Sequence, residues 1–157
     1  MDFPERIVVF SLDEQRYGLS LRATERVLAA VEVTPLPKAP AIVQGVFNLQ
    51  GRIIPVMNVR RRFGLTERPI TPEDQFVVAR AGGRSVALVV DATDGVVETP
   101  ANAVVPPATI LPELPYVHGV FRLADGLVLI HDLNSFLALD EAATLDVALS
   151  ASEGRIC

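Results

Sequence analysis

The chain has 157 residues, half of them apolar, and a formal net charge of -5. This length suits one compact domain or two small lobes, and the acidic balance argues against a protein that coats nucleic acid, which needs clustered Lys and Arg. The only cysteine is Cys157, so an intrachain disulfide and a four-cysteine zinc site are excluded. No apolar run reaches the roughly 18 residues of a membrane helix, and residues 1–13 lack a signal-peptide pattern. We therefore expect a cytoplasmic protein without direct membrane insertion.

The first predicted element is a β-hairpin. Apolar residues alternate over 7–12, polar residues that favour a turn follow at 13–16, and the alternation resumes over 17–21. Side chains two residues apart lie on one face of a strand, so each run predicts a strand with a buried face. The stretch 76–90 repeats this design around a Gly-Gly turn, which predicts a second hairpin of the same kind.

A second, longer unit also occurs twice, because residues 43–63 align without a gap to residues 117–137. Each copy predicts a strand, a tight turn, a second strand and a short helical turn, capped by Asn58 in the first copy and by Asp132 in the second. Gly64 suits a left-handed end of the first helical turn. Strands this short leave open edges unless a sheet closes, so the duplication predicts an all-β chain of two small barrels related by pseudosymmetry.

Local features add to this prediction. Pro55 lies inside a predicted strand and has no N–H to donate, so we expect it at a sheet edge or a bulge. The arginines at 60–62 are expected on the solvated face of the helical turn, since a short basic triplet beside an apolar residue is a weak indication of nucleic-acid binding. Residues 34–40 and 64–74 have the Pro-rich and polar composition of surface connectors.

The last predicted element is a closing helix over 140–149, in which Leu145 and Leu149 lie one turn apart and Asp140 is the cap. We expect a disordered tail over 150–157. Apolar residues in the Pro-rich stretches 31–36 and 110–116 have no place in the predicted strands. They would either cover the barrel ends or form an apolar groove for a partner.

No constellation of residues predicts catalysis, a metal or a cofactor. His118 and His131 lack the spacing of a metal site, and the sequence has no nucleophile elbow, phosphate loop or dinucleotide loop. A hydrolase that uses His131 and Asp132 is one alternative, although the counterpart of Asp132 in the first copy is Asn58, which cannot ionise. A small-ligand carrier is another, although barrels of this size are normally filled by their own side chains. We predict a protein that is not an enzyme.

The stretch GVFNLQGRIIPVMNVRRRFGL at 45–65 resembles the CheW family, in which a G-V-x-N-L-R-G turn precedes an apolar I-x-P-[IV] strand and a capped helical turn. The likeness extends over roughly residues 6–139. It implies a single CheW-like domain with sequence repeats at about 6–65 and 74–139, folded as an intertwined pair of SH3-like five-stranded barrels. It also implies a non-enzymatic adaptor that binds the regulatory domain of a CheA-type histidine kinase on one surface and the cytoplasmic tip of a chemoreceptor on another.

The resemblance places the partner-binding residues in the turn after the first strand of the longer unit and in the segment after the first hairpin: Arg26, Gly45, Asn48, Leu49, Gln50 and Gly51. Two of these residues depart from the family pattern: where this chain has Gln50 the family has arginine, and where it has Arg26 the family has glutamate. An arginine–carboxylate pair would thus become an Arg–Gln pair that loses the bidentate charge contact. A divergent adaptor of a non-flagellar array, controlling pili or gliding, is therefore an alternative, and so is a purely structural turn around Gly51.

Overall fold

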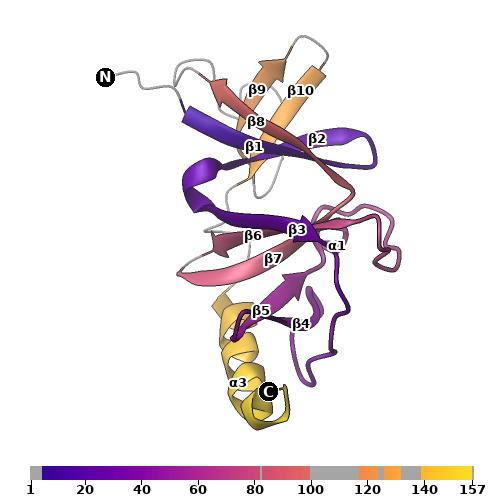
Figure 1. Cartoon of the computed structure of the whole chain (residues 1–157), viewed down its shortest axis with the longest axis vertical. Helices are drawn as coiled ribbons and strands as arrows, with labels where there is room; N and C mark the ends of the chain where they lie inside the picture. Colours follow the sequence, from indigo (N-terminus) through magenta and orange to yellow (C-terminus); the bar gives the residue numbers. More distant parts are fainter. Residues whose placement is uncertain (1–4, 82, 100–116, 124–125, 132–138, 157) are drawn as a thin grey trace.

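The computed structural model describes residues 5–81, 83–99, 117–123, 126–131 and 139–156. Its elements in chain order are β1 (Glu5–Leu12), β2 (Gln15–Ser20), the 3-10 turn η1 (Leu21–Ala23), β3 (Thr24–Ala29), β4 (Val43–Leu49), β5 (Arg52–Met57), α1 (Val59–Arg62), β6 (Gln75–Ala81), β7 (Arg84–Val90), β8 (Ala92–Thr99), β9 (Val117–Leu123), β10 (Gly126–His131) and α3 (Leu139–Ile156). The strands form two five-stranded sheets, stacked along the long axis of the molecule, with α3 below the second sheet (Figure 1).

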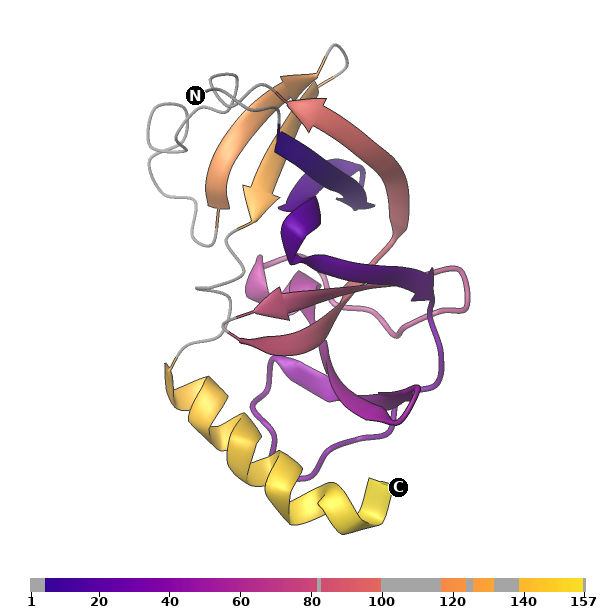
Figure 2. The ribbon, with the colours of Figure 1, turned by 60° about the vertical axis from the view of Figure 1, so that its left-hand side comes forward.

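Each sheet takes strands from both halves of the chain. Sheet A has the order β8-β1-β2-β10-β9, and sheet B has the order β3-β6-β7-β5-β4. Strand β3 follows β2 directly in sequence but pairs with β6, and β8 follows β7 but pairs with β1. The chain therefore crosses from one sheet to the other after β2 and again after β7, as the two ribbons that join the upper and lower layers show (Figure 2).

The two sheets correspond strand by strand, which confirms the predicted all-β, pseudosymmetric SH3-like fold. The hairpin β1–β2 of sheet A matches β6–β7 of sheet B, and both are antiparallel. The hairpin β9–β10 matches β4–β5, and in each sheet its second strand pairs in parallel with the second strand of the other hairpin. The residues of the longer repeat that the structure describes, 117–123 and 126–131, thus follow the same path as 43–49 and 52–57.

The alternation of side chains along each strand explains how the strands of sheet B bury both faces. Val77 faces the core between the sheets, together with Phe10 and Leu19 of sheet A and Met57 and Leu88 of sheet B. The neighbouring residues of β6 face a second buried cluster inside sheet B, which contains Phe47, Leu49, Ile54, Val56, Phe76, Val78 and Ala87. Each residue step along a strand turns the side chain to the other face, so one apolar strand supplies both cores.

Pro55 is not at an edge, because β5 lies between β7 and β4 in sheet B. Its pair residue on β4 is Val46, whose backbone N–H and C=O both bond to Thr34 on the far side, each at 2.8 Å. Pro55 therefore has no hydrogen bond to give to β4, and the pairing of β5 with β7 starts only at Val56. An interior strand tolerates this proline because the missing N–H falls outside both ladders.

The C-terminal helix is confirmed, but its predicted limits were wrong. It runs from Leu139 to Ile156, so Asp140 lies inside its first turn, and the segment 150–156 is helical instead of disordered. Leu145 and Ala148 are buried and belong to the same apolar cluster as Val77 and Leu88. The end of the helix lacks an apolar repeat, but a helix already fixed by packing adds residues such as Ala and Glu at little cost. No helix among the described residues is long and apolar enough to cross a membrane.

Candidate partner-binding site

The β4–β5 turn presents three of the predicted binding residues. Gln50 and Gly51 both have positive φ, 52° and 88°, as in a tight two-residue hairpin turn of type I′. The side-chain Oδ1 of Asn48 accepts a hydrogen bond from the backbone N–H of Gly51 at 2.8 Å. All three residues are exposed. The turn is therefore a rigid, solvent-facing tip at one end of sheet B.

Gly45 and Leu49, also predicted to bind a partner, are buried in strand β4. A Cβ atom on Gly45 would lie 2.4 Å from the backbone oxygen of Thr34 and 2.6 Å from Cγ1 of Val33. Only glycine therefore lets the connector after β3 approach and pair with Val46. Leu49 packs in the cluster inside sheet B. Both residues hold the tip in place from behind.

Arg26 is exposed on β3, the strand at the opposite edge of sheet B from β4. Within the described residues, its guanidinium makes no hydrogen bond or ion pair, and neither does the side chain of Gln50. The pairing between β3 and β6 shifts by one residue between Thr24 and Arg26, so the bulge residue is Glu25. The structure thus does not join Arg26 to Gln50, the pair expected from the family pattern.

An arginine–carboxylate pair does exist at this end of sheet B, between two residues that the sequence analysis missed. Nη2 of Arg52, the first residue of β5, lies 3.0 Å from Oε2 of Glu25. Ser85 on β7 donates its hydroxyl to Oε1 of the same carboxylate. These hydrogen bonds from Ser85 and Arg52 hold the pKa of Glu25 below its usual value. Each residue is adjacent or nearly adjacent in sequence to a predicted one, but their contact depends on the β3–β6 bulge, which no local pattern revealed.

The arginine triplet was wrongly predicted to be solvated throughout. Arg60 is only 8% exposed, and its Nη2 lies 2.8 Å from both Asp91 Oδ1 and Asp13 Oδ1. Asp13 is in the β1–β2 turn of sheet A, and Asp91 lies between β7 and β8, where the chain crosses between sheets. Burial opposes ionisation of Asp91, but hydrogen bonds from the Asp13 N–H and from Arg60 lower its pKa overall. Arg60 is therefore a structural link between the sheets.

The same network reaches the connector 64–74. Arg68 donates to Asp74 at 2.7 Å and to Asp91 at 2.8 Å. Asp74 is buried, and its hydrogen bonds from Arg68 lower its pKa. Both ends of α1 have the predicted geometry. At the start, the Asn58 side chain accepts a hydrogen bond from the Arg61 N–H at 3.0 Å, and after the end, Gly64 has a φ of 71°. The predicted counterpart of Asn58, Asp132, lies outside the described residues.

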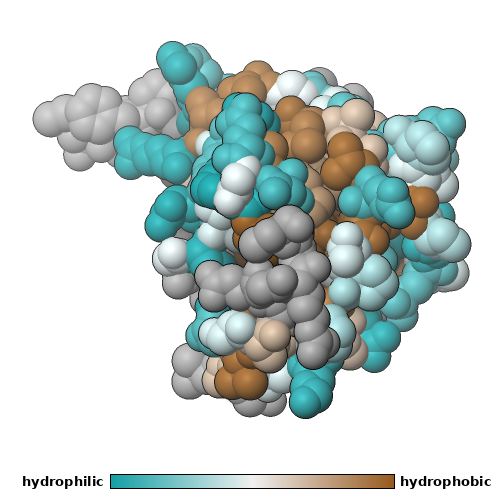
Figure 3. Space-filling view, turned by 60° about the horizontal axis from the view of Figure 1, so that its bottom comes forward, coloured by the Kyte–Doolittle hydropathy of each residue, from teal (hydrophilic) through white to brown (hydrophobic). Residues whose placement is uncertain are grey.

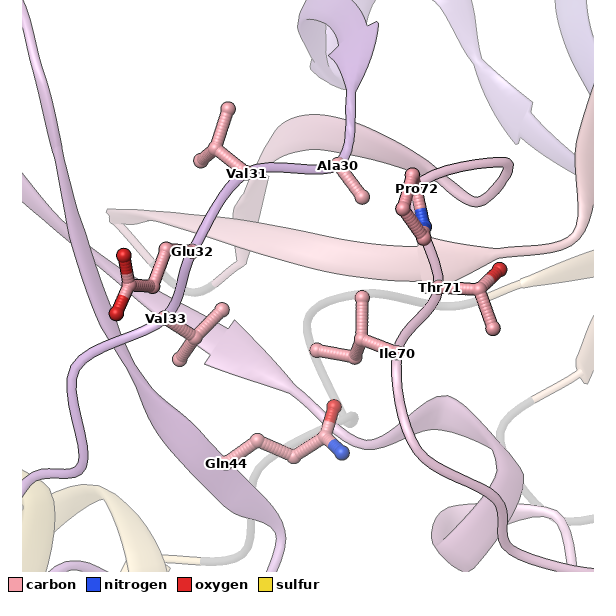
Figure 4. Close-up of a pocket in the computed structure, with 8 residues that line it drawn as sticks. All are labelled: Ala30, Val31, Glu32, Val33, Gln44, Ile70, Thr71 and Pro72. Atoms are coloured by element: carbon pink, nitrogen blue, oxygen red, sulfur yellow. The ribbon is translucent and has the colours of Figure 1, made fainter.

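An open hollow of about 430 Å³ lies at the other end of sheet B, between the connector after β3 and the connector 64–74. Val33 and Ile70 face each other across it, and Glu32 points away (Figure 4). The interior of sheet B is filled by its own side chains, such as Phe47 and Phe76. The hollow is thus a surface feature, and the described residues do not show the enclosed cavity that a small-ligand carrier would need.

The lower face of the molecule has apolar side chains in separate patches among hydrophilic ones (Figure 3). The described part of the chain contains no group of three or more His, Cys, Asp or Glu that could hold a metal ion. His131 is the last residue of β10, while Asp132, its partner in the hydrolase alternative, lies outside the described residues.

The fold has counterparts among known proteins. The family model described as the CheW-like domain matches residues 6–141. The chain belongs to the CheW-like family. This CheW-like chain is 27% identical over 146 residues to the chemotaxis protein CheW of Treponema pallidum, with 89% of this chain and 86% of that protein covered. It is 34% identical over 98 residues to CheW of Thermotoga maritima, covering 61% and 63% of the two chains.

A solved structure supports the same assignment. The crystal structure of the scaffolding protein TtCheW from Thermoanaerobacter tengcongensis superposes with a TM-score of 0.80 at 30% sequence identity, covering 88% of this CheW-like chain and 96% of that one. The likeness therefore includes both sheets. The family match and this superposition agree with the predicted fold class.

Proposed function

We propose that this CheW-like chain is a non-enzymatic adaptor of a chemosensory pathway, which couples the cytoplasmic tips of chemoreceptors to the regulatory domain of a CheA-type histidine kinase. The observation that carries the proposal is the family match over residues 6–141 together with a superposition that covers both sheets. The proposed site of action is the cytoplasm, at the receptor arrays of the membrane.

The proposed binding surface is the exposed tip formed by Asn48, Gln50 and Gly51, together with Arg26 on β3. A hairpin turn whose backbone is fixed by Asn48 loses little conformational freedom when a partner binds. Gly45 and Leu49 support the tip through the close approach of Val33 and Thr34 and through the core of sheet B. Gly45 and Leu49 therefore contribute to binding by fixing the position of the turn.

The test uses the purified full chain with two partners encoded in the same genome, the kinase regulatory domain and a receptor cytoplasmic fragment. We expect isothermal titration calorimetry to detect binding of each partner, and receptor-dependent autophosphorylation of the kinase to increase only when the chain is added. A chain that is folded by circular dichroism but binds neither partner would contradict the proposal.

A further inference from the structure

Two exposed arginines surround a single carboxylate next to the proposed tip. The side chains of Arg52 and Arg80 are 53% and 58% exposed, and that of Glu25 is 24% exposed. Arg26, the next residue after Glu25, is exposed and adds a third positive charge. The chain as a whole carries a net charge of -5, so this end of sheet B differs in sign from the molecule.

Strand register explains why these groups converge. Arg80 pairs with Ser85 across β6 and β7, and Arg52 pairs with Leu49 across β5 and β4. Residues two positions further along these strands, such as Ile54 and Val78, belong to the cluster inside sheet B. Alternation puts the side chains of Arg52, Arg80 and Ser85 on the same face as that cluster, at its end. The two guanidinium groups thus lie at the end of the apolar cluster inside sheet B.

Glu25 orders the two arginines and leaves many of their donors free. Its Oε2 accepts from Arg52 Nη2 at 3.0 Å, while Oε1 accepts from the Ser85 hydroxyl and lies 3.9 Å from Arg80 Nη1. A second nitrogen of Arg52 donates to Ser85 Oγ at 3.3 Å, and Arg80 Nη2 donates to the Gly83 carbonyl at 3.2 Å. A guanidinium has five N–H donors, so each arginine retains donors that face solvent.

We propose that Arg52 and Arg80, held by Glu25, form an anion-recognising surface that binds Asp or Glu side chains of the partner protein at the tip. This inference rests on the proposed adaptor function and names the chemistry of its interface. Arg52 supplies, two residues after Gln50, the planar bidentate donor that the chain lacks at position 50. The overall negative charge would repel a nucleic acid at long range, which favours a protein carboxylate as the anion.

The test compares the unmodified full chain with the double variant Arg52→Gln/Arg80→Gln. Both are titrated with the kinase regulatory domain and with the receptor fragment at about 50 mM and about 300 mM NaCl, since exposed charges are screened by salt. The control is Arg6→Gln, because the Arg6 side chain is also mostly exposed, 64%, and makes a comparable ion pair with Glu98 at 3.3 Å on sheet A. Chemical denaturation of each variant verifies that it is folded.

We expect the double variant to bind at least one partner about fivefold or more weakly at low salt, with a smaller salt dependence, while Arg6→Gln leaves both affinities within about twofold. Arg52→Lys combined with Arg80→Gln should bind more tightly than the double variant, because lysine at position 52 keeps the charge but not the bidentate geometry. A double variant that binds both partners as the unmodified chain does, or a loss that Arg6→Gln reproduces, would overturn the inference alone. If the unmodified chain binds neither partner, the proposed function fails and this inference fails with it.

Discussion

Nη2 of Arg60 donates a hydrogen bond to Oδ1 of Asp91 at 2.8 Å and joins α1 to the segment where the chain passes from sheet B to sheet A. The same nitrogen lies 2.8 Å from Asp13 in the β1–β2 turn. One buried cation is therefore shared by a helical turn, a crossover and a hairpin of the other sheet. The relative placement of the two sheets depends on this contact as well as on the apolar core between them.

Arg60→Gln should destabilise the protein by about 2 kcal/mol, because it removes the buried cation shared by Asp13 and Asp91 and leaves Asp91 with Arg68 as its remaining cation. The free energy of unfolding in urea measures this. The control is Arg61→Gln, since the Arg61 side chain is 50% exposed and its ion pair with Glu67 is long, at 3.6 Å. That variant should remain within about 0.5 kcal/mol of the unmodified chain. Equal effects of the two substitutions would contradict the structural role of Arg60.

The buried carboxylate of Asp74 predicts a loss of stability in acid. Hydrogen bonds from Arg68 lower its pKa in the folded state below the value of about 3.9 for an unfolded aspartate. Its contribution is therefore fully present above pH of about 4 and is lost as the pH falls through the folded pKa. Asp74→Asn should lower the free energy of unfolding at pH 7 by about 1 to 2 kcal/mol and reduce the difference between pH 7 and pH 3. Glu73→Gln, at an exposed neighbouring residue, should change neither.

Elements set by local patterns could be predicted from the sequence, and those set by contacts between distant segments could not. Hairpins with period-two alternation, such as 7–21 and 76–90, appear where they were expected. The interior position of Pro55 depends on Thr34, which takes the hydrogen bonds of the strand paired with it. No pattern around the proline reports that partner.

The candidate site shows the same division. The exposed turn at Gln50 and Gly51 follows from the residue types that favour a hairpin, but the Glu25–Arg52 pair joins the edge strand β3 to β5, from which it is separated in sheet B by β6 and β7. Arg60 looked like part of a solvated basic triplet because its acidic partners, Asp13 and Asp91, are distant in sequence. Burial of a charge depends on long-range pairing, so composition around it is a poor guide.

Gly45→Ala should destabilise the fold by about 2 kcal/mol or more, because the new methyl group would clash with the Thr34 carbonyl and Val33. The control is Gly51→Ala, where nothing lies within 4 Å of the added Cβ and the cost is the positive φ alone, about 1 kcal/mol. Denaturant midpoints measure both. If Gly45→Ala is as stable as the unmodified chain, the connector after β3 is not held by this close approach.

Asn58→Asp should keep the cap of α1 but introduce repulsion. The amide Nδ2 of Asn58 donates to Oε1 of Glu67 at 2.7 Å, so an aspartate would face that carboxylate directly. We expect a loss of about 1 to 2 kcal/mol at pH 7, recovered when Glu67→Gln removes the opposing charge. A double-mutant cycle of unfolding free energies measures the coupling. Additive effects of the two substitutions would show that Asn58 acts only as a cap.

The departure from the family pattern at Gln50 and Arg26 gives the sharpest test of the proposed tip. Gln50 is exposed at the end of a rigid turn, so Gln50→Arg should leave the free energy of unfolding within about 0.5 kcal/mol. It adds a positive charge to an end of sheet B that already displays Arg26, Arg52 and Arg80, while Arg26→Glu removes one and restores a carboxylate. We therefore expect each single substitution to alter the affinity for the kinase domain or the receptor fragment. The effect of the double substitution on this affinity should differ from the sum of the two single effects.

Calorimetric titration of the four proteins completes a double-mutant cycle for Gln50→Arg and Arg26→Glu. The structure shows no contact between these two side chains, so a coupling energy of about 0.5 kcal/mol or more would mean that both face the same partner group, or that an introduced arginine reaches the introduced glutamate. Repeating the cycle for unfolding distinguishes these cases, because a direct pair also couples in the free chain, whereas a shared partner couples only in binding. Unchanged affinity in all three variants, with the fold intact, would show that the turn is structural and that the tip is not the binding surface.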